Sequence, residues 1–259
     1  MAAWEENELR ALYWDKELST VEIGEKFGYT ARNVGYYMRK FGISRRSNSE
    51  AHQLGFRKKP HPGCIHPNLE FNENMAYILG VLFGDGNVNK NGSQYRIQLN
   101  NTRKSFAESF AKALRLIGLH PCFYTVKLSK KDPKHSDVFC VVATSKMFYN
   151  WFKGLTLIDV RRLLIRDIKY TKGFLRGFYE SEGTLQHRTK NCWRIRIYNS
   201  NVKILNIIQN LLTYLGFNHS FHQSKRKKTK DEYSVDILGG TKETFRFLSE
   251  VNPCIKKVR

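Results

Sequence analysis

The pattern of apolar and polar positions divides the chain into three parts. The N-terminal part has a helical period, and Leu9, Leu12 and Tyr13 fall on one face of a helix predicted over residues 4–17. Residues 47–73 mix Arg, Lys, Pro and Gly without a sustained period, which predicts a basic linker that is ordered poorly or only on DNA. Such a linker either follows a phosphate backbone or is a solvated tether. In the remaining part, helical and strand periods alternate.

Two further helices in the N-terminal part begin with cap signals. Ser19, with Glu22 three residues later, forms a capping box, and the helix that it starts ends at Gly28. Thr30 caps a third helix over residues 31–40. Two short helices joined by a tight, Gly-containing turn are typical of a helix-turn-helix, in which the third helix would be the recognition helix. A plain three-helix bundle with a basic surface is the alternative.

The C-terminal part contains the same order of elements twice. In the first copy, Tyr95, Ile97 and Leu99 alternate with polar residues after an Asn-Gly hairpin signal. The predicted strands cover residues 87–89, 94–99, 122–129, 137–143, 185–189, 191–199, 219–225 and 233–238, and the predicted helices cover residues 103–116, 145–153, 201–215 and 241–251. Each copy is headed by one more helix, so the copies are αββαββα units related by a pseudo-two-fold axis.

The predicted fold class is therefore α+β. Its parts are a helix-turn-helix domain over residues 1–46, the linker over residues 47–73, and two halves over residues 74–168 and 169–259.

Charge narrows the choice of partner. The chain has 44 Lys and Arg against 23 Asp and Glu, a net charge of +21, which indicates a polyanionic partner. Nucleic acid is favoured over an anionic membrane, because no run approaches the roughly 18 apolar residues of a spanning helix. The acidic N-terminus is not a signal peptide, and the five scattered cysteines are expected to be reduced thiols. We expect an intracellular, DNA-associated protein without a small-molecule substrate.

The helix at the head of each copy ends on an acid followed by Gly. Each helix is an apolar run around a central glycine, Gly80 or Gly177, and the acids are Asp85 and Glu182. Two such helices packed through their glycines would place both acids at one point. Two carboxylates held together are suited to divalent cations.

This doubled motif resembles the LAGLIDADG homing endonucleases, in the form that carries both motifs on one chain. Asp85 and Glu182 match the metal-binding acid of the family. The earlier acid of the family is present as Glu180 in the second copy, where it is a supporting acid or a cap, but is replaced by Phe83 in the first. The resemblance covers residues 74–259 and leaves out the helix-turn-helix.

The resemblance implies a saddle-shaped, monomeric enzyme that hydrolyses both strands of a long, nearly asymmetric DNA target. Mg²⁺ is the implied metal, with Mn²⁺ as a substitute, and Ca²⁺ is expected to occupy the site without turnover. An RNA maturase and a DNA-binding regulator of the same fold are the alternatives. The presence of both acids favours the nuclease. No splicing residues are visible, so an intron-encoded or free-standing protein is expected.

The resemblance also implies a peripheral pocket of amide and basic side chains that orders the attacking water. The amides are Asn101 and Asn199. The basic group is Lys257 or Lys256 in the second half and Arg161 or Arg162 in the first, with Lys172 as a further candidate. The predicted catalytic residues are thus Asp85, Glu182, Asn101, Asn199, Lys257 and Lys172, and the predicted metal site contains Asp85, Glu182, Gly84 and Ser181.

The predicted DNA contacts come from side chains that read bases or hold phosphates. A β-ribbon can enter the major groove, where Arg and Gln make bidentate contacts to guanine and adenine. The strand faces predicted to point outward hold almost no acid, whereas an ordinary solvated face would carry both signs. The predicted contacts are Arg32, Asn33, Tyr36, Arg39, Lys40, Arg45, Arg46, Gln94, Arg96, Gln98, Thr125, Lys127, Arg194, Arg196, Gln223, Lys225 and Lys227.

Overall fold

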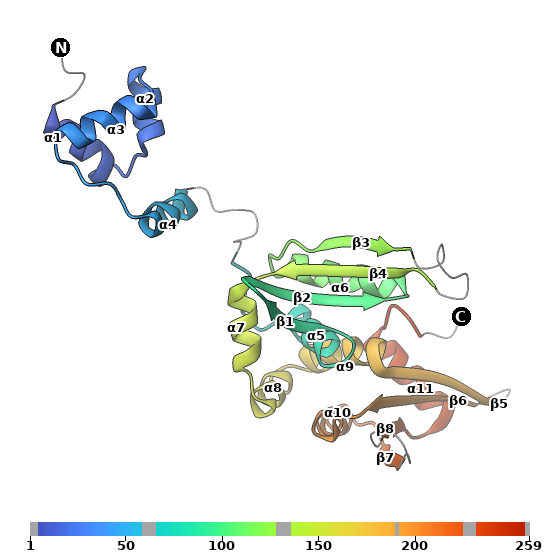
Figure 1. Cartoon of the computed structure of the whole chain (residues 1–259). Coiled ribbons are helices and arrows are strands. Elements are labelled where there is room, and N and C mark those ends of the chain that lie inside the picture. Colours follow the sequence, from blue (N-terminus) through green and yellow to red (C-terminus); the bar gives the residue numbers. More distant parts are fainter. Residues whose placement is uncertain (1–4, 59–65, 128–135, 190–191, 225–231, 257–259) are drawn as a thin grey trace. The chain divides into compact units, whose positions relative to one another are not determined.

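The computed structural model describes residues 5–58, 66–127, 136–189, 192–224 and 232–256 of the chain. The chain forms two compact units, residues 1–61 and 62–259, which are described in turn (Figure 1). The boundary falls inside the predicted linker. Within the described ranges, no helix is both long and apolar enough to cross a membrane.

The N-terminal unit is helical and has a small core of its own. Its elements are α1 (Glu6–Arg10), the π-helical turn η1 (Ala11–Asp15), α2 (Thr20–Phe27), α3 (Ala31–Lys40) and α4 (Asn48–Lys58). Leu9, Ile23, Val34 and Met38 are fully buried between these elements. The first predicted helix is therefore present, but it widens into a π-turn halfway along.

The cap signals that define the second and third helices are confirmed. Ser19 Oγ accepts a hydrogen bond from Glu22 N (3.1 Å), and the Glu22 carboxylate accepts one from Ser19 N (2.7 Å). Thr30 Oγ1 accepts a hydrogen bond from Asn33 N (3.3 Å). Gly28, with a φ of 76°, ends α2 in the left-handed conformation that glycine adopts without strain.

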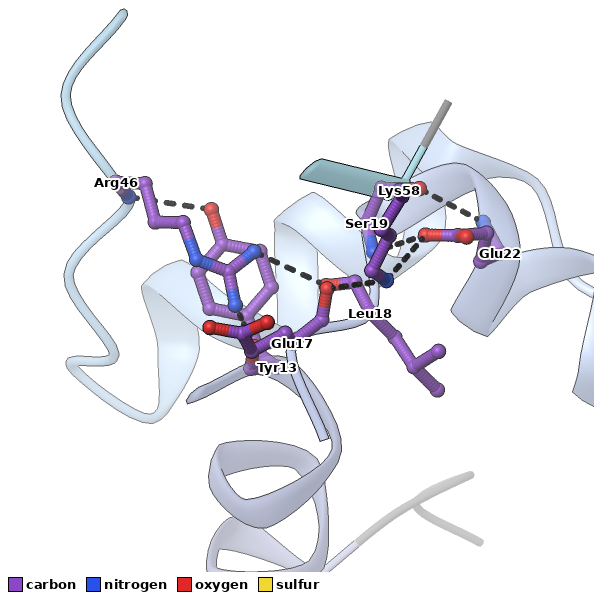
Figure 2. A network of polar contacts seen from close by, with 7 residues as sticks. All are labelled: Tyr13, Glu17, Leu18, Ser19, Glu22, Arg46 and Lys58. Atoms are coloured by element: carbon purple, nitrogen blue, oxygen red, sulfur yellow. Dashed lines mark hydrogen bonds and ion pairs between the residues drawn. The ribbon is translucent and has the colours of Figure 1, made fainter. Parts of the chain in front are cut away.

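The predicted linker is wrong over its first part, because α4 lies there. Ser47 and Glu50 form a second capping box, in which Ser47 N donates to the Glu50 carboxylate at 2.7 Å and Glu50 N donates to Ser47 Oγ at 3.2 Å. At the other end of α4, Lys58 Nζ donates to the carbonyl oxygen of Glu17 at 2.7 Å and lies 3.5 Å from the Glu22 carboxylate (Figure 2). The helix therefore packs onto the N-terminal unit.

Arg46, which we predicted to contact DNA, is instead part of this unit's framework. Its backbone N–H donates to the Tyr13 hydroxyl (3.1 Å), and its guanidinium donates to the carbonyl oxygens of Leu18 (3.2 Å) and Tyr13 (Figure 2). The guanidinium also lies over the Tyr13 ring, 4.1 Å from its centroid. These contacts leave Arg46 half-buried and occupied, and the sequence offers no sign of them because their partners lie about 30 residues away.

We expect Arg46→Ala to destabilise the N-terminal unit by about 1–3 kcal/mol, because it removes hydrogen bonds from a charged donor and a cation–π contact. Hydrogen exchange of backbone amides in α2 and α3 of the full chain, without DNA, measures this effect. Arg39→Ala, on the exposed side of α3, is the control and should leave exchange unchanged. Equal exchange in the two variants would contradict the structural role of Arg46.

The C-terminal unit consists of two halves with the predicted αββαββα order. The first half contains α5 (Glu73–Phe83), β1 (Asn87–Asn91), β2 (Gln94–Asn101), α6 (Lys104–Leu116), β3 (Cys122–Val126), β4 (Val138–Thr144) and α7 (Lys146–Gly154). The second contains α9 (Ile168–Glu182), β5 (Gly183–Thr189), β6 (Cys192–Asn199), α10 (Val202–Tyr214), β7 (His219–Ser224), β8 (Glu232–Ile237) and α11 (Gly240–Val251). The two antiparallel sheets have the matching strand orders β1-β2-β4-β3 and β5-β6-β8-β7.

One helix between the halves was not predicted. It is α8 (Leu157–Leu164), which follows α7 and precedes α9. Its start is a capping box in which Thr156 Oγ1 accepts from Asp159 N (3.2 Å) and the Asp159 carboxylate accepts from Thr156 N (3.0 Å). This Thr-x-x-Asp spacing is the sequence signal that identifies the helix.

The two halves pack against each other through α5 and α9, which lie side by side between the sheets (Figure 1). A Cβ added at Gly80 would lie 2.9 Å from Phe178 N, and one at Gly177 would lie 2.9 Å from Val81 N. Each would also overlap a backbone carbonyl oxygen of the facing helix. The predicted close approach through the central glycines is thus confirmed.

Strand alternation decides which face of each sheet meets the helices. Ile97 and Leu99 on β2, and Ile195 and Ile197 on β6, are buried in the cores of the two halves. The residues between them on each strand lie on the opposite face. Each half thus presents one sheet face that its own helices do not cover.

We expect Gly177→Ala to lower the stability of the C-terminal unit by at least about 1–3 kcal/mol, since a packed backbone contact must open. Thermal unfolding measures the change. Gly154→Ala, at the end of α7 where an added Cβ meets nothing within 4 Å, is the control and should be neutral or slightly stabilising. A Gly177→Ala protein as stable as the control would show that the helices do not depend on this contact.

Candidate functional site

The two motif helices bring their exit residues together. α5 ends at Phe83 and α9 ends at Glu182. A Cβ added at Gly84 would lie 2.8 Å from Ser181 Oγ and 3.2 Å from Glu182 Cγ, so the exits are in contact. Asp85, the next residue after Gly84, therefore lies beside Glu182 as predicted.

An asparagine holds each of the two acids in the same way. Asn101 Nδ2 donates to Asp85 Oδ2 and Asn199 Nδ2 donates to Glu182 Oε1, both at 3.2 Å. Each asparagine lies two residues beyond a core-facing Leu or Ile on its strand, so strand alternation turns it toward the helix ends.

The amide groups are fixed in orientation by the chain that follows them. Asn101 Oδ1 accepts from Arg103 N at 2.9 Å, and Asn199 Oδ1 accepts from Asn201 N at 2.8 Å. With the oxygen engaged, each NH₂ group is left to face its carboxylate. The hydrogen bonds around Asp85 are therefore repeated in detail around Glu182.

The electrostatics of the pair favour added positive charge. Burial, followed by the charge of Asp85, raises the pKa of Glu182 to about 7. Burial also raises the pKa of Asp85. Within the described ranges, no three or more His, Cys, Asp or Glu side chains gather in a way that could hold a metal ion, so the pair itself is the candidate site. The two carboxylates form an oxygen-only donor set of the kind that a hard divalent cation prefers.

Lys256 is the basic group that reaches this pair. Its Nζ donates to the carbonyl oxygens of Tyr179 (3.1 Å), Glu180 (2.7 Å) and Ser181 (2.9 Å) at the end of α9. Burial lowers the pKa of Lys256 to about 8, although its charge favours the ionised forms of both acids. Of the two lysines proposed for this position, Lys257 lies outside the described residues.

The other basic candidates lie elsewhere. Lys172 forms an ion pair with Glu250 at 3.0 Å, ten residues before Glu182 on the same helix, or about 15 Å along its axis. The structure therefore does not bring Lys172 to the two acids. Arg161 and Arg162 lie on α8, where they line a groove with residues of α10.

The earlier acid position of the motif has a structural role in both halves. Glu180 is buried and accepts hydrogen bonds from the Tyr77 hydroxyl (2.7 Å) and from Cys254 N (2.5 Å). Phe83 packs against the rings of Phe152 and Phe174. Glu180 thus joins the facing motif helix to the segment that carries Lys256.

The uncovered sheet faces carry most of the predicted base readers. Gln94, Arg96 and Gln98 on β2 point away from the core, as do Arg194 and Arg196 on β6, because their neighbours face inward. Their placement agrees with the prediction. DNA contact itself remains a prediction for all of them.

On the edge strands β3 and β7, the residues that we predicted to face outward are shifted by one position and face the core instead. Thr125 pairs with Phe139 and Gln223 pairs with Tyr233, and both therefore lie on the core side of their sheets. The outward residues include Tyr124 on β3 and His222 on β7. These strands lack a clean alternation, so their polar Thr and Gln were misleading. Lys127 pairs with Asp137 at 2.9 Å, and Lys225 and Lys227 lie outside the described residues.

The predicted recognition surface on α3 is exposed. Arg32, Asn33, Tyr36, Arg39 and Lys40 all lie on the solvent side, with Tyr36 55% exposed. Arg45 is also exposed and its guanidinium lies against Gly35 of the same helix. Helices α2 and α3 lie where the helix-turn-helix was predicted. That they form a DNA-binding helix-turn-helix remains a prediction.

Comparison with known proteins identifies relatives of the C-terminal unit. The family described as a LAGLIDADG-like domain matches residues 72–156 and 169–252, one match in each half. The uncharacterized protein MJ0314 of Methanocaldococcus jannaschii is 34% identical over 169 residues, which cover 64% of this chain and 63% of that protein. The match thus spans less than two thirds of that relative's length.

A second relative is described by an activity. The homing endonuclease I-DmoI of Desulfurococcus mucosus is 25% identical over 165 residues, 61% of this chain and 78% of that protein. Its crystal structure in complex with DNA and Mn superposes with a TM-score of 0.50 at 20% identity, covering 69% of this chain and 96% of that one. This likeness confirms the predicted two-half fold.

We expect Glu182→Gln to stabilise the metal-free protein above pH 7 by a few degrees in thermal unfolding. The folded-state pKa of Glu182 is raised from 4.5 to about 7, so its stabilising contribution is present below pH 4.5 and is lost as the pH rises through 7. The amide never ionises. The difference in melting temperature in EDTA should grow from pH 5 to pH 8.

Glu70→Gln, at an exposed acid, is the control and should show no such trend. Parallel pH profiles for the wild type and Glu182→Gln would contradict the assigned electrostatics.

Proposed function

The chain belongs to the LAGLIDADG family, and from that premise we propose that it is a site-specific endonuclease that hydrolyses both strands of double-stranded DNA. The observation that carries the proposal is the repeated carboxylate–asparagine pair at the exits of the motif helices. Two such pairs at one point, one from each half, suit the hydrolysis of two phosphodiester bonds by a single chain.

Asp85 and Glu182 are the residues that would hold Mg²⁺ or Mn²⁺, with Gly84 and Ser181 beside them. A bound divalent cation neutralises phosphate charge and assists the leaving oxygen. The two carboxylates are buried and repel each other, and the positive charge around them does not balance this repulsion. A divalent cation would supply the missing positive charge. Ca²⁺ has the same ligand preference and is proposed to bind without turnover.

The chain's own residues provide position and charge. Asn101 and Asn199 hold the acids in fixed rotamers. Lys256, whose Nζ is occupied by three carbonyl oxygens, is a positioning residue that holds the end of α9 and adds positive charge near the phosphates. In hydrolysis, a water oxygen loses a proton and forms a bond to phosphorus as the bridging phosphorus–oxygen bond breaks, and the leaving oxygen takes up a proton.

The DNA would lie along the outward faces of the two sheets. A net charge of +21 supports association with a polyanion, and Arg and Gln side chains on β2 and β6 are suited to base contacts. The N-terminal unit, through the exposed face of α3, would add contacts to the flanking DNA. Because both motifs are on one chain, we propose that it acts as a monomer.

We expect the full chain to cut both strands of a recognised site in a DNA library when Mg²⁺ is present, and to lose cutting in EDTA. Asp85→Asn and Glu182→Gln should each lower the cutting rate on the order of a hundredfold or more, because each removes charge that acts in the transition state. Both variants should keep DNA binding, as measured by gel shift.

Lys172→Met is the matched control, since its ion pair lies far from the acids, and it should cut normally. Tight, selective binding by a wild-type chain that never cuts would support a DNA-binding regulator, and selective binding of intron RNA would support a maturase. Undiminished cutting by either acid variant would show that the metal site is misplaced.

A further inference from the structure

Asp236 is a buried carboxylate in the middle of the outward, basic face of the second sheet. It lies on β8, directly opposite Arg196 of β6 on one side and Ser220 of β7 on the other. Residues paired across strands share a face, so the carboxylate lies among the predicted base readers. It is 0% exposed.

Three cationic or titratable side chains converge on this one carboxylate. Arg196 donates from Nε to Oδ1 at 2.5 Å and from Nη2 to Oδ2 at 2.7 Å, a bidentate contact. Arg194 Nη2 forms an ion pair with Oδ2, and His222 Nε2 lies 3.2 Å from Oδ2. Ser220 Oγ in turn lies 2.9 Å from His222 Nε2, which completes the cluster.

These contacts hold the two arginines in place. The side chains of Arg194 and Arg196 are only 16% and 23% exposed, far less than a solvated arginine. The bidentate contact of Arg196 uses two of the five N–H donors of a guanidinium, which leaves donors for a base edge. A side chain already fixed in its rotamer loses little entropy when it binds.

Among the described residues of the first half, this arrangement is absent. The position opposite Gln98, which matches Arg196 in the repeat, is Val142 rather than an acid. The guanidinium of Arg96 is held by a neutral group, Gln94 Oε1, at 2.6 and 3.0 Å. In the part of the chain that the structure describes, the carboxylate clamp therefore belongs to the second half.

We propose that Asp236 is a positioning residue that sets the sequence specificity of the second half-site. It holds Arg194 and Arg196 in the geometry that contacts guanine, for which arginine is the preferred partner in the major groove. Its negative charge also opposes the phosphates of DNA of any sequence. This inference rests on the proposed DNA recognition, but not on DNA cleavage.

The test compares base preference across the whole site by selecting DNA from a random library with the full chain in Ca²⁺, where cutting is not required. We expect the wild type to prefer guanine at positions of the second half-site. Asp236→Asn should lower that preference about tenfold or more at those positions only, and should bind random DNA more tightly at low salt.

Asp137→Asn makes the same charge change at the Lys127 ion pair of the first sheet and is the matched control. It should leave the second half-site preference intact. Arg196→Lys keeps the charge but loses the fork geometry, so it should weaken the same positions as Asp236→Asn. Thermal unfolding of each variant checks that the fold is retained.

An unchanged preference in both Asp236→Asn and Arg196→Lys would overturn the proposal, as would an equal loss over both half-sites. Failure to select any DNA would overturn it together with DNA recognition. Selective binding that depends on Asp236, in a chain that does not cut, would support the clamp while removing the nuclease proposal.

Discussion

The close contact between α5 and α9 is the constraint on which the rest of the C-terminal unit depends. Glycines at the crossing let the two backbones approach, so both helices end at one place. The acids at those ends are then brought together, partly buried, beside helix C-termini that already carry partial negative charge. The high pKa of Glu182 is a result of this packing. Lys256, donating to three terminal carbonyl oxygens, offsets part of the same charge.

Most of this arrangement could be predicted because its signals are local or repeated. Capping boxes mark helix starts within four residues, and α4 shows the same signal in a segment whose basic composition suggested a linker. The doubled Gly and acid pattern predicted both the helix contact and the paired carboxylates. Asn101 and Asn199 were named from the family resemblance, and they continue the core-facing phase of clearly alternating strands.

The parts that could not be predicted depend on partners distant in the chain. Arg46 lies in a basic segment of the kind that binds DNA, yet its guanidinium donates hydrogen bonds to carbonyl groups of the N-terminal unit. Lys172 has the right position in the motif but meets Glu250 instead. Asp236 appears in the sequence as one acid among apolar residues, and only the strand register shows that it lies opposite Arg196. Without clean alternation, the phase of β3 and β7 was open to a shift of one residue.

The short connection through α8 has a consequence for how the two halves can differ. It makes the pairing of α5 with α9 an intramolecular event, at an effective concentration on the order of millimolar or above, rather than a dimerisation that depends on dilution. Identical subunits of a symmetric dimer must carry every substitution twice. Joined halves are free of that requirement: one motif helix keeps a buried acid at Glu180 while the other has Phe83. Covalent linkage thus lets the two halves of a symmetric scaffold carry different side chains at matching positions.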